Sequence, residues 1–164
     1  MKVWLIGMSC AGKSTLARLA AAATGGAHLD GDMVRATPVS EGLGFTPEER
    51  ALHLARVGTI AQWLDRFAPH VFCSFQAPTE AVRRTLPIDL LVYVRCSVET
   101  CMVRDVKGLW AKARAGEIQN LAGYDVPYED PTHPDLVLDT DDWTVDECLA
   151  RLLRTVAEKA GDVR

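Results

Sequence analysis

The segment Gly7–Ser14, which reads G-M-S-C-A-G-K-S, matches the phosphate-binding pattern G-x-x-x-x-G-K-[ST] at every fixed position. In such a loop the backbone N–H groups and the dipole of the following helix favour bound phosphate. Lys13 is predicted to reach the β- and γ-phosphates of a nucleoside triphosphate, and the Ser14 hydroxyl to bind Mg²⁺. The residues expected to contact this nucleotide, taken as ATP, are Gly7, Ser9, Cys10, Ala11, Gly12, Lys13, Ser14 and Thr15, with Ser14 as the metal ligand.

The residues on both sides of this loop suit the strand–loop–helix unit that a phosphate site requires. Val3–Ile6 is an apolar run typical of a buried strand, and residues 15–22 are rich in strong helix formers. The alternative is a glycine turn that precedes Lys-Ser by chance. That alternative does not account for the strand and the helix beside it.

Two carboxylates follow the next short strand. Asp30 and Asp32 come directly after residues 27–29, at the end of a strand where ligands bind in open α/β folds. Phosphoryl transfer needs a carboxylate near the acceptor hydroxyl, and either side chain suits this role or holds the metal through water. We favour Asp32 for the hydroxyl. An Asp-Gly-Asp sequence is more often a turn, but its place after a strand argues against that here.

Apolar runs alternate with helical patterns along the chain. Strands are expected at residues 3–6, 27–29, 70–75, 90–94 and 136–139, and helices at 15–22, 47–67, 77–85, from Ser97 onward and at 143–159. The apolar side of the longest helix is assigned to Leu52, Ala55, Val57, Ile60, Ala61 and Leu64. This alternation predicts an α/β fold with a parallel five-stranded sheet flanked by helices on both faces. Without a repeat or a linker, residues 1–164 are expected to form one domain.

The pattern weakens between residues 105 and 123. Basic side chains at Lys107, Lys112 and Arg114 lie there among several glycines. A basic, glycine-hinged segment beside a nucleotide site predicts a lid that closes over bound phosphates.

Composition limits the classes of partner. The 164 residues carry a formal net charge of −4, which argues against a nucleic-acid surface. No apolar run is long enough to cross a bilayer, so no membrane partner is expected. The five cysteines include no C-x-x-C pair and are interpreted as reduced thiols of a cytoplasmic protein.

Three blocks carry a resemblance to one family. Leu29–Arg35 resembles the L-D-G-D-N-V-R of adenylyl-sulfate (APS) kinases, and Leu43–Arg50 resembles their L-G-F-[ST]-x-x-[DE]-R. Residues 104–118 are similar to R-D-V-K-G-L-[YW]-x-K-A-R-x-G-E-I. The blocks occur in the family's order and the likeness covers nearly the whole chain, which is far more specific than the phosphate loop alone.

The resemblance implies a P-loop NTPase three-layer sandwich that moves the γ-phosphate of ATP, with Mg²⁺, to the ribose 3′-hydroxyl of adenosine 5′-phosphosulfate (APS), giving PAPS. Dimers are common in this family, so the resemblance is compatible with a homodimer, although the sequence leaves the oligomeric state open. The implied catalytic residues are Lys13, Asp30 and Asp32. The implied residues for the acceptor are Asp32, Arg35, Phe45, Arg50, His53, Phe75, Gln76, Lys107 and Leu121. Without the resemblance, Arg50 would be taken for a solvated helix residue, and Phe45 suits a core position equally well.

Four departures from the family pattern lie on the acceptor side. His53 replaces an asparagine, Ala77 a serine described as a phosphorylation site, Glu80 an arginine, and Leu121 a phenylalanine that stacks on the acceptor adenine. The helix after Ala77 is also shorter than in the family, and Cys10 replaces a small residue of the loop. Two alternatives therefore stay open: a kinase of this fold for another anionic acceptor, and a nucleotide-binding module without kinase activity.

Overall fold

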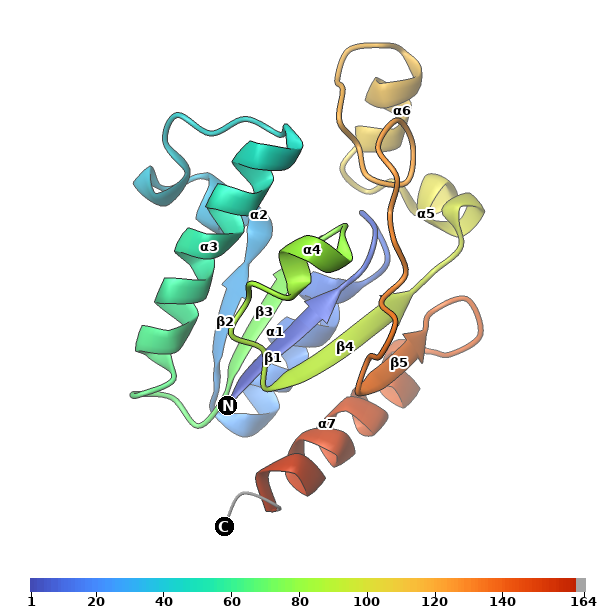
Figure 1. Cartoon of the computed structure of the whole chain (residues 1–164). Helices are drawn as coiled ribbons and strands as arrows, with labels where there is room; N and C mark the ends of the chain where they lie inside the picture. Colours follow the sequence, from blue (N-terminus) through green and yellow to red (C-terminus); the bar gives the residue numbers. More distant parts are fainter. Residues whose placement is uncertain (162–164) are drawn as a thin grey trace.

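The computed structural model describes residues 1–161 and contains one five-stranded sheet in the order β2-β3-β1-β4-β5. Every neighbouring pair of strands is parallel, as predicted. Helices α1 and α7 cover one face, whereas α2, α3 and α4 cover the other (Figure 1). The result is the three-layer α/β arrangement expected from the alternating pattern.

The elements follow one another in the expected βα alternation. The bounds are β1 Lys2–Ile6, α1 Lys13–Thr24, β2 Ala27–Asp30, α2 Gly31–Arg35, the 3₁₀ helix η1 Pro38–Ser40, α3 Pro47–Leu64, β3 Val71–Phe75, α4 Glu80–Arg83, β4 Leu90–Arg95, α5 Val98–Arg104, α6 Leu109–Arg114, β5 Leu136–Asp139 and α7 Val145–Gly161.

The central strand β1 divides the core into two layers because successive side chains point to opposite faces. Val3 and Leu5 pack with α1 and α7, whereas Trp4 and Ile6 pack against α3. All four side chains are fully buried. A strand apolar on both faces is what a parallel sheet covered by two helical layers requires.

All five strands end at the same edge of the sheet, where β1 runs into the phosphate loop. Gly7 has φ +153°, and a Cβ there would lie 2.4 Å from the Val94 carbonyl oxygen. Only glycine suits this approach of the loop to β4. The turn then delivers the loop to the start of α1, so that the site forms at the upper end of the sheet in Figure 1.

Two predicted helices are shorter in the structure. The helix expected over 77–85 is only α4, Glu80–Arg83, because Ala77 has φ +42° and the Thr79 hydroxyl caps the helix after Pro78. The helix expected to reach residue 67 ends at Leu64. The following Asp65 instead accepts a 3.2 Å bond from the Lys2 ammonium.

The buried stripe of α3 also differs from the prediction. Leu52 is 48% exposed and Ala55 is exposed, whereas His53, Leu54 and Gly58 are buried. Pro87 explains part of this orientation, since a Cβ at position 58 would lie 2.9 Å from its Cδ. The helix is thus rotated so that His53 faces inward.

The predicted lid contains α6, which the sequence pattern did not indicate. Trp110 and Ala113 of this helix are buried, so the segment is anchored to the layer of α1 and α7.

Within residues 1–161, no helix is both long and apolar enough to cross a membrane.

Candidate active site

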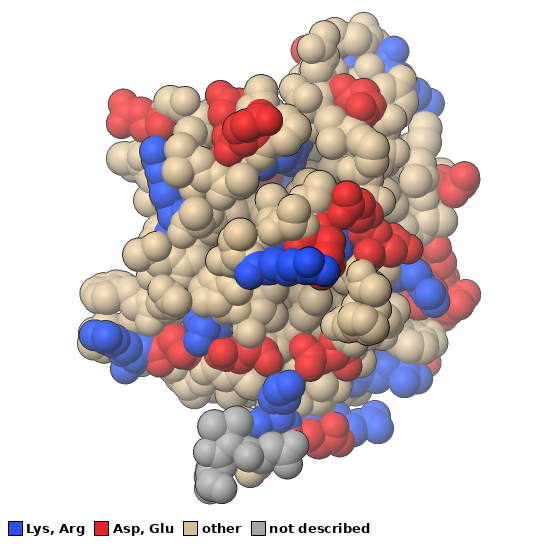
Figure 2. All heavy atoms as spheres, viewed as in Figure 1, with Lys and Arg blue, Asp and Glu red and all other residues tan. Residues whose placement is uncertain are grey.

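A cavity of about 710 Å³ opens at the carboxyl edge of the sheet. Figure 2 shows the surface hollowed between the part built on the start of α3 and the part built on α6, with basic atoms inside. The cavity brings the predicted site together: every predicted site residue except Gly7 lines it. These lining residues are Ser9, Cys10, Ala11, Gly12, Lys13, Ser14, Thr15, Asp30, Asp32, Arg35, Phe45, Arg50, His53, Phe75, Gln76, Lys107 and Leu121.

The side chain of Lys13 is folded back onto the phosphate loop. Lys13 is 8% exposed, and its ammonium donates a 2.6 Å bond to the Met8 carbonyl. Burial, and then the charge of Lys107, lower the pKa of Lys13 to about 8. Five cationic side chains but only two carboxylates line the cavity, and this excess of positive charge favours a phosphate chain as ligand.

Asp30 is a buried carboxylate with a fixed orientation. Its Oδ1 caps α2 by accepting from the amides of Asp32 at 3.0 Å and Met33 at 3.3 Å. Its Oδ2 accepts a 2.9 Å bond from the Ser74 hydroxyl. Although burial opposes it, hydrogen bonds from Ser14, Ser74 and the two amides lower the pKa of Asp30, so the group is ionised.

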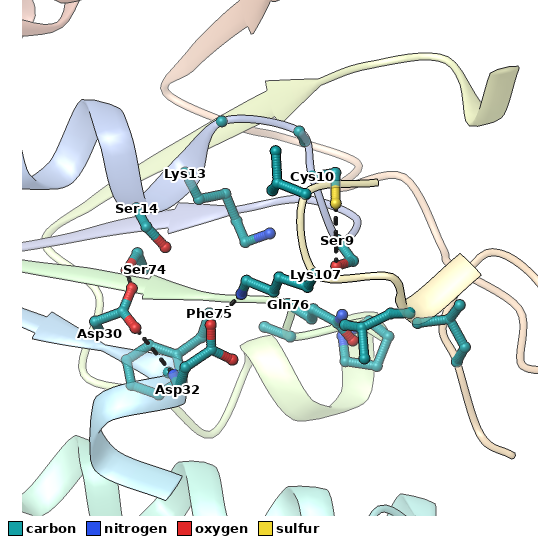
Figure 3. Close-up of a pocket in the computed structure, with 18 of the residues that line it drawn as sticks. Ser9, Cys10, Lys13, Ser14, Asp30, Asp32, Ser74, Phe75, Gln76 and Lys107 are labelled. Carbon is teal, nitrogen blue, oxygen red and sulfur yellow. Dashed lines mark hydrogen bonds and ion pairs between the residues drawn. The ribbon is translucent and has the colours of Figure 1, made fainter. Parts of the chain in front are cut away.

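Asp32, the second residue of α2, is exposed and pairs with Lys107 of the predicted lid segment. The ammonium of Lys107 reaches its Oδ2 across the cavity, as Figure 3 shows. The two aspartates therefore differ in environment: Asp30 is buried and held by the fold, whereas Asp32 is exposed, faces the cavity and has Lys107 as its partner. This difference supports the assignment of Asp32, rather than Asp30, to a reacting hydroxyl.

Arg35, Phe45 and Arg50 form one cluster at the far side of the cavity. Arg35 donates to the carbonyls of Leu43 at 3.1 Å and Gly44 at 2.9 Å, which fixes the loop before α3. Its guanidinium carbon lies 4.6 Å from the centre of the Phe45 ring. The Phe45 side chain is 52% exposed, so its prediction as a cavity residue is consistent with its position and the core alternative is wrong.

Arg50 ties three segments together. Its side chain donates to the Phe45 carbonyl at 2.9 Å, to Gln76 Oε1 at 3.0 Å and to the carbonyl of Asn120 in the lid segment. Arg50 is therefore no solvated surface residue. It contacts the loop before α3, the end of β3 and the lid at once.

His53 is buried beside this cluster. Its Nδ1 lies 3.1 Å from the Ser40 hydroxyl, and its Nε2 is buried without a hydrogen-bond partner in the described chain. Burial, followed by the charges of Arg35, Arg56 and Arg50, lowers the pKa of His53 to about 4. The ring is therefore neutral near pH 7.

The remaining acceptor-side residues differ in what they offer. Phe75 is 4% exposed and packs its ring 5.9 Å from that of His53. Leu121 is also buried and belongs to the core cluster that includes Trp110. Glu80, by contrast, does not line the cavity: it accepts a 3.0 Å bond from buried Arg83. The negative charge that the sequence placed near the acceptor is thus neutralised outside the cavity.

Several cavity residues were missed from the sequence. Arg104, Thr140 and Trp143 line the end of the cavity beyond Gly12. Arg104 donates to the Thr140 hydroxyl at 3.0 Å, which joins α5 to the segment after β5. Two sequence features could have indicated these residues. Arg104 begins the block that resembles the family pattern, and Thr140 directly follows a predicted strand, at the edge of the sheet where ligands bind.

The fold and the site together define a class of protein. A phosphate loop with its lysine faces two carboxylates of unlike environment, and cationic side chains line the same cavity opposite the loop. This is the arrangement of a P-loop kinase for a small molecule. The family model described as adenylylsulphate kinase matches residues 1–139, and the chain belongs to this family.

Relatives and solved structures agree with this assignment. The adenylyl-sulfate kinase of Halothermothrix orenii is 41% identical over 166 residues, covering 96% of this chain and 89% of the relative. That of Oceanobacillus iheyensis is 37% identical over 168 residues, covering 96% and 84%. The Mycobacterium tuberculosis APS kinase in complex with AMPPNP and APS has a TM-score of 0.87 at 33% identity, covering 95% of this chain and 96% of that chain.

Proposed function

We propose that this protein transfers the γ-phosphate of ATP to the ribose 3′-hydroxyl of APS, giving ADP and PAPS. The observation that carries this proposal is the single cavity that joins Lys13 of the phosphate loop to Asp32 and to the cluster of Arg35, Phe45 and Arg50. Donor and acceptor would thereby share one cavity, as in-line transfer requires. The adenylyl-sulfate kinases among its relatives, and the solved APS kinase in complex with AMPPNP and APS, support the same reaction.

The donor half of the cavity would bind MgATP. The loop amides and Lys13 would contact the β- and γ-phosphates, with the Lys13 ammonium exchanging the Met8 carbonyl for phosphate oxygens. Mg²⁺, when bound, neutralises charge on the transferred phosphoryl group. Ser14 and Asp30 fit such an ion, since both offer oxygen ligands and both line the cavity beside the phosphate loop.

The acceptor half would present the hydroxyl. Asp32 would accept the proton of the 3′-hydroxyl while the oxygen of that hydroxyl forms a bond to the γ-phosphorus. The bond between that phosphorus and the β–γ bridging oxygen breaks, and ADP leaves with the electron pair. Lys107 would leave Asp32 for the phosphates during this step, which links lid position to catalysis.

The phosphosulfate of APS would bind to Arg35 and Arg50, whose planar guanidinium groups suit oxyanions. Phe45 would stack on the adenine, with Leu121 as the apolar contact on the other side. Because Ala77 has no hydroxyl, the transfer would be direct, without a phosphoenzyme at that position.

Steady-state turnover of ATP with APS tests this proposal. We expect a kcat/KM for APS of roughly 10⁴ M⁻¹s⁻¹ or more, in the ordinary enzyme range. The acceptor panel should include adenosine 5′-phosphate, 3′-deoxy-APS and APS itself. Turnover of another acceptor, with none of APS by protein that binds ATP, would favour a rebuilt acceptor pocket. ATP binding without any turnover would favour a non-catalytic module.

The Lys13→Ala variant supplies the donor-side control, and it should lose turnover with little change in melting temperature. The expectation of a homodimer stays a prediction, which sedimentation velocity of the purified protein tests directly.

A further inference from the structure

The residue His28 lies in β2, outside every role assigned above, and it is linked to the active site by a short chain of hydrogen bonds. Its Nε2 lies 2.9 Å from the Ser74 hydroxyl, which in turn donates at 2.9 Å to Oδ2 of Asp30. Figure 3 shows Ser74 beside the Asp30 carboxylate, with Ser14 facing the same group. We propose that His28 is a positioning residue that aims the Ser74 hydroxyl at Asp30 and so holds that carboxylate in its working orientation.

Strand pairing brings the three residues together. Residues two apart in a strand point to the same face, so His28 and Asp30 share one side of β2. Asp30 lies directly opposite Ser74 in the neighbouring strand β3. His28 therefore reaches Ser74 diagonally, from a strand position that only a long polar side chain can use.

The direction of each hydrogen bond follows from counting protons. A serine hydroxyl has one proton, and the ionised carboxylate of Asp30 has none. The Ser74 proton must therefore lie toward Asp30, which leaves the Ser74 oxygen as an acceptor for His28. Neutral His28 must carry its proton on Nε2, and this tautomer is a prediction that can be measured in the free protein.

The fold leaves Asp30 little other support on this oxygen. Its Oδ1 is fixed by the two amides at the start of α2, whereas Oδ2 accepts one hydrogen bond within the described residues, from the Ser74 hydroxyl, with Nε2 of His28 3.9 Å away. A hydroxyl without a donor behind it is free to turn toward another acceptor. His28 removes this freedom, so the effect of losing it should appear in the catalytic step and in the affinity for magnesium-bound nucleotide, rather than in the affinity for APS.

This inference rests on the proposed function for its kinetic arm only. The test compares His28→Gln, whose amide nitrogen replaces the Nε2 donor, with His28→Leu, which has no donor. His70→Leu is the matched control, because His70 precedes β3 and does not line the cavity. Assays at pH 8 keep the histidine neutral, since burial lowers the pKa of His28.

We expect kcat to fall roughly fivefold in His28→Leu, the size of one ordinary hydrogen bond, with the KM for APS unchanged. His28→Gln should stay within about twofold of wild type by the same reasoning. In a Ser74→Ala background, His28→Leu should have no further effect, because the hydroxyl that connects His28 to Asp30 is already absent. Equal losses in the Gln and Leu variants, or an undiminished effect in the Ser74→Ala background, would overturn the proposal.

Two readouts do not depend on turnover. Nitrogen NMR of the free protein at pH 8 should show His28 as the Nε2-protonated tautomer, and the Nδ1-protonated form would refute the inference even if His28→Leu fails to fold. Calorimetry with ADP should show a weaker Mg²⁺-dependent affinity in His28→Leu but not in His28→Gln. If wild type fails to turn over APS, the proposed function fails while these two measurements still decide the role of His28.

Discussion

At the scale of single residues, the proposed acceptor side of the cavity contains a buried histidine, His53, near three arginines. Arg35, Arg56 and Arg50 all disfavour a proton on His53, and burial disfavours it further. A neutral ring in this position adds no positive charge to the pocket that we propose for the anionic acceptor. It also leaves the free energy of unfolding sensitive to pH, because the unfolded chain accepts the proton that the folded chain refuses.

The first prediction uses this sensitivity. His53 has an ordinary pKa of 6.5 and a folded value of about 4, so the unfolded state binds more protons between these values. The free energy of unfolding attributable to His53 should therefore fall as pH falls, by about 2 kcal/mol from pH 7 to pH 5. Urea unfolding of wild type and His53→Asn at both pH values measures it, because asparagine does not titrate. A difference between the two proteins that is independent of pH would contradict the assignment.

At the scale of elements, α4 shows why a sequence pattern cannot tell whether a single charged side chain faces a binding pocket. The Glu80 carboxylate contacts Arg83, which also donates to the carbonyls of Ala77 at 2.9 Å and Pro78 at 3.1 Å. A buried arginine with its donors satisfied in this way is a structural clamp. Glu80 belongs to this clamp and not to the acceptor pocket.

The second prediction follows from that clamp. Glu80→Arg should leave the KM for APS unchanged and should lower the free energy of unfolding by about 1–3 kcal/mol, because it removes a charged hydrogen bond and places like charges together. Glu80→Gln is the control, since it keeps an acceptor for Arg83 and should lose less. Tighter APS binding in the arginine variant would show that position 80 faces the acceptor after all.

The lid is the second element whose behaviour can be predicted. Two cationic side chains of the site already cross the cavity: Lys107 to Asp32, and Arg50 to the Asn120 carbonyl. Bound phosphates and phosphosulfate would compete for these cations, so we expect the predicted lid to exchange protein contacts for ligand contacts. Gly108 and Gly116, with φ values of +64° and +73°, provide positions where the backbone can turn.

The third prediction is that amides of residues 105–123 exchange more slowly with solvent when an ATP analogue and APS are bound together. Hydrogen exchange followed by mass spectrometry measures this, with the α7 peptides as the internal control. Lys107→Ala should reduce the protection gained, because a contact to the phosphates is lost. Identical exchange in the free and bound protein would rule out a moving lid.

The chemistry-bearing residues were predictable where they lie in contiguous patterns. The phosphate loop and the Asp30–Asp32 pair each follow a strand, so their position at one edge of a parallel sheet follows from local spacing. The partners of Glu80 and the contact between His28 and Ser74 were not predictable, because they depend on β2 lying beside β3 and on where α4 begins. The rotation of α3 that buries His53 likewise depends on packing against Pro87.

At the scale of the whole molecule, the five parallel strands and the two helical layers follow from the alternating pattern, but the strand order does not. The order β2-β3-β1-β4-β5 places β1 in the centre, between β3 and β4. That order makes β1 the common wall of both core layers, with Val3 and Leu5 in one and Trp4 and Ile6 in the other. Loss of packing in either layer would expose the face of β1 that packs in that layer and would remove support from the strand on which the other layer also depends.

The last prediction follows from this shared strand: we propose that the described residues, 1–161, unfold as one cooperative domain. Calorimetry should give a single transition whose measured enthalpy equals the van't Hoff enthalpy. Adding an ATP analogue with Mg²⁺ should raise the midpoint temperature of this single transition, because the ligand binds only the folded state. Trp4→Leu, which loses apolar contacts in the α3 layer alone, should lower the midpoint by several degrees and leave one transition. Two transitions, of which the nucleotide shifts only one, would show that the α3 layer and the α1–α7 layer fold separately.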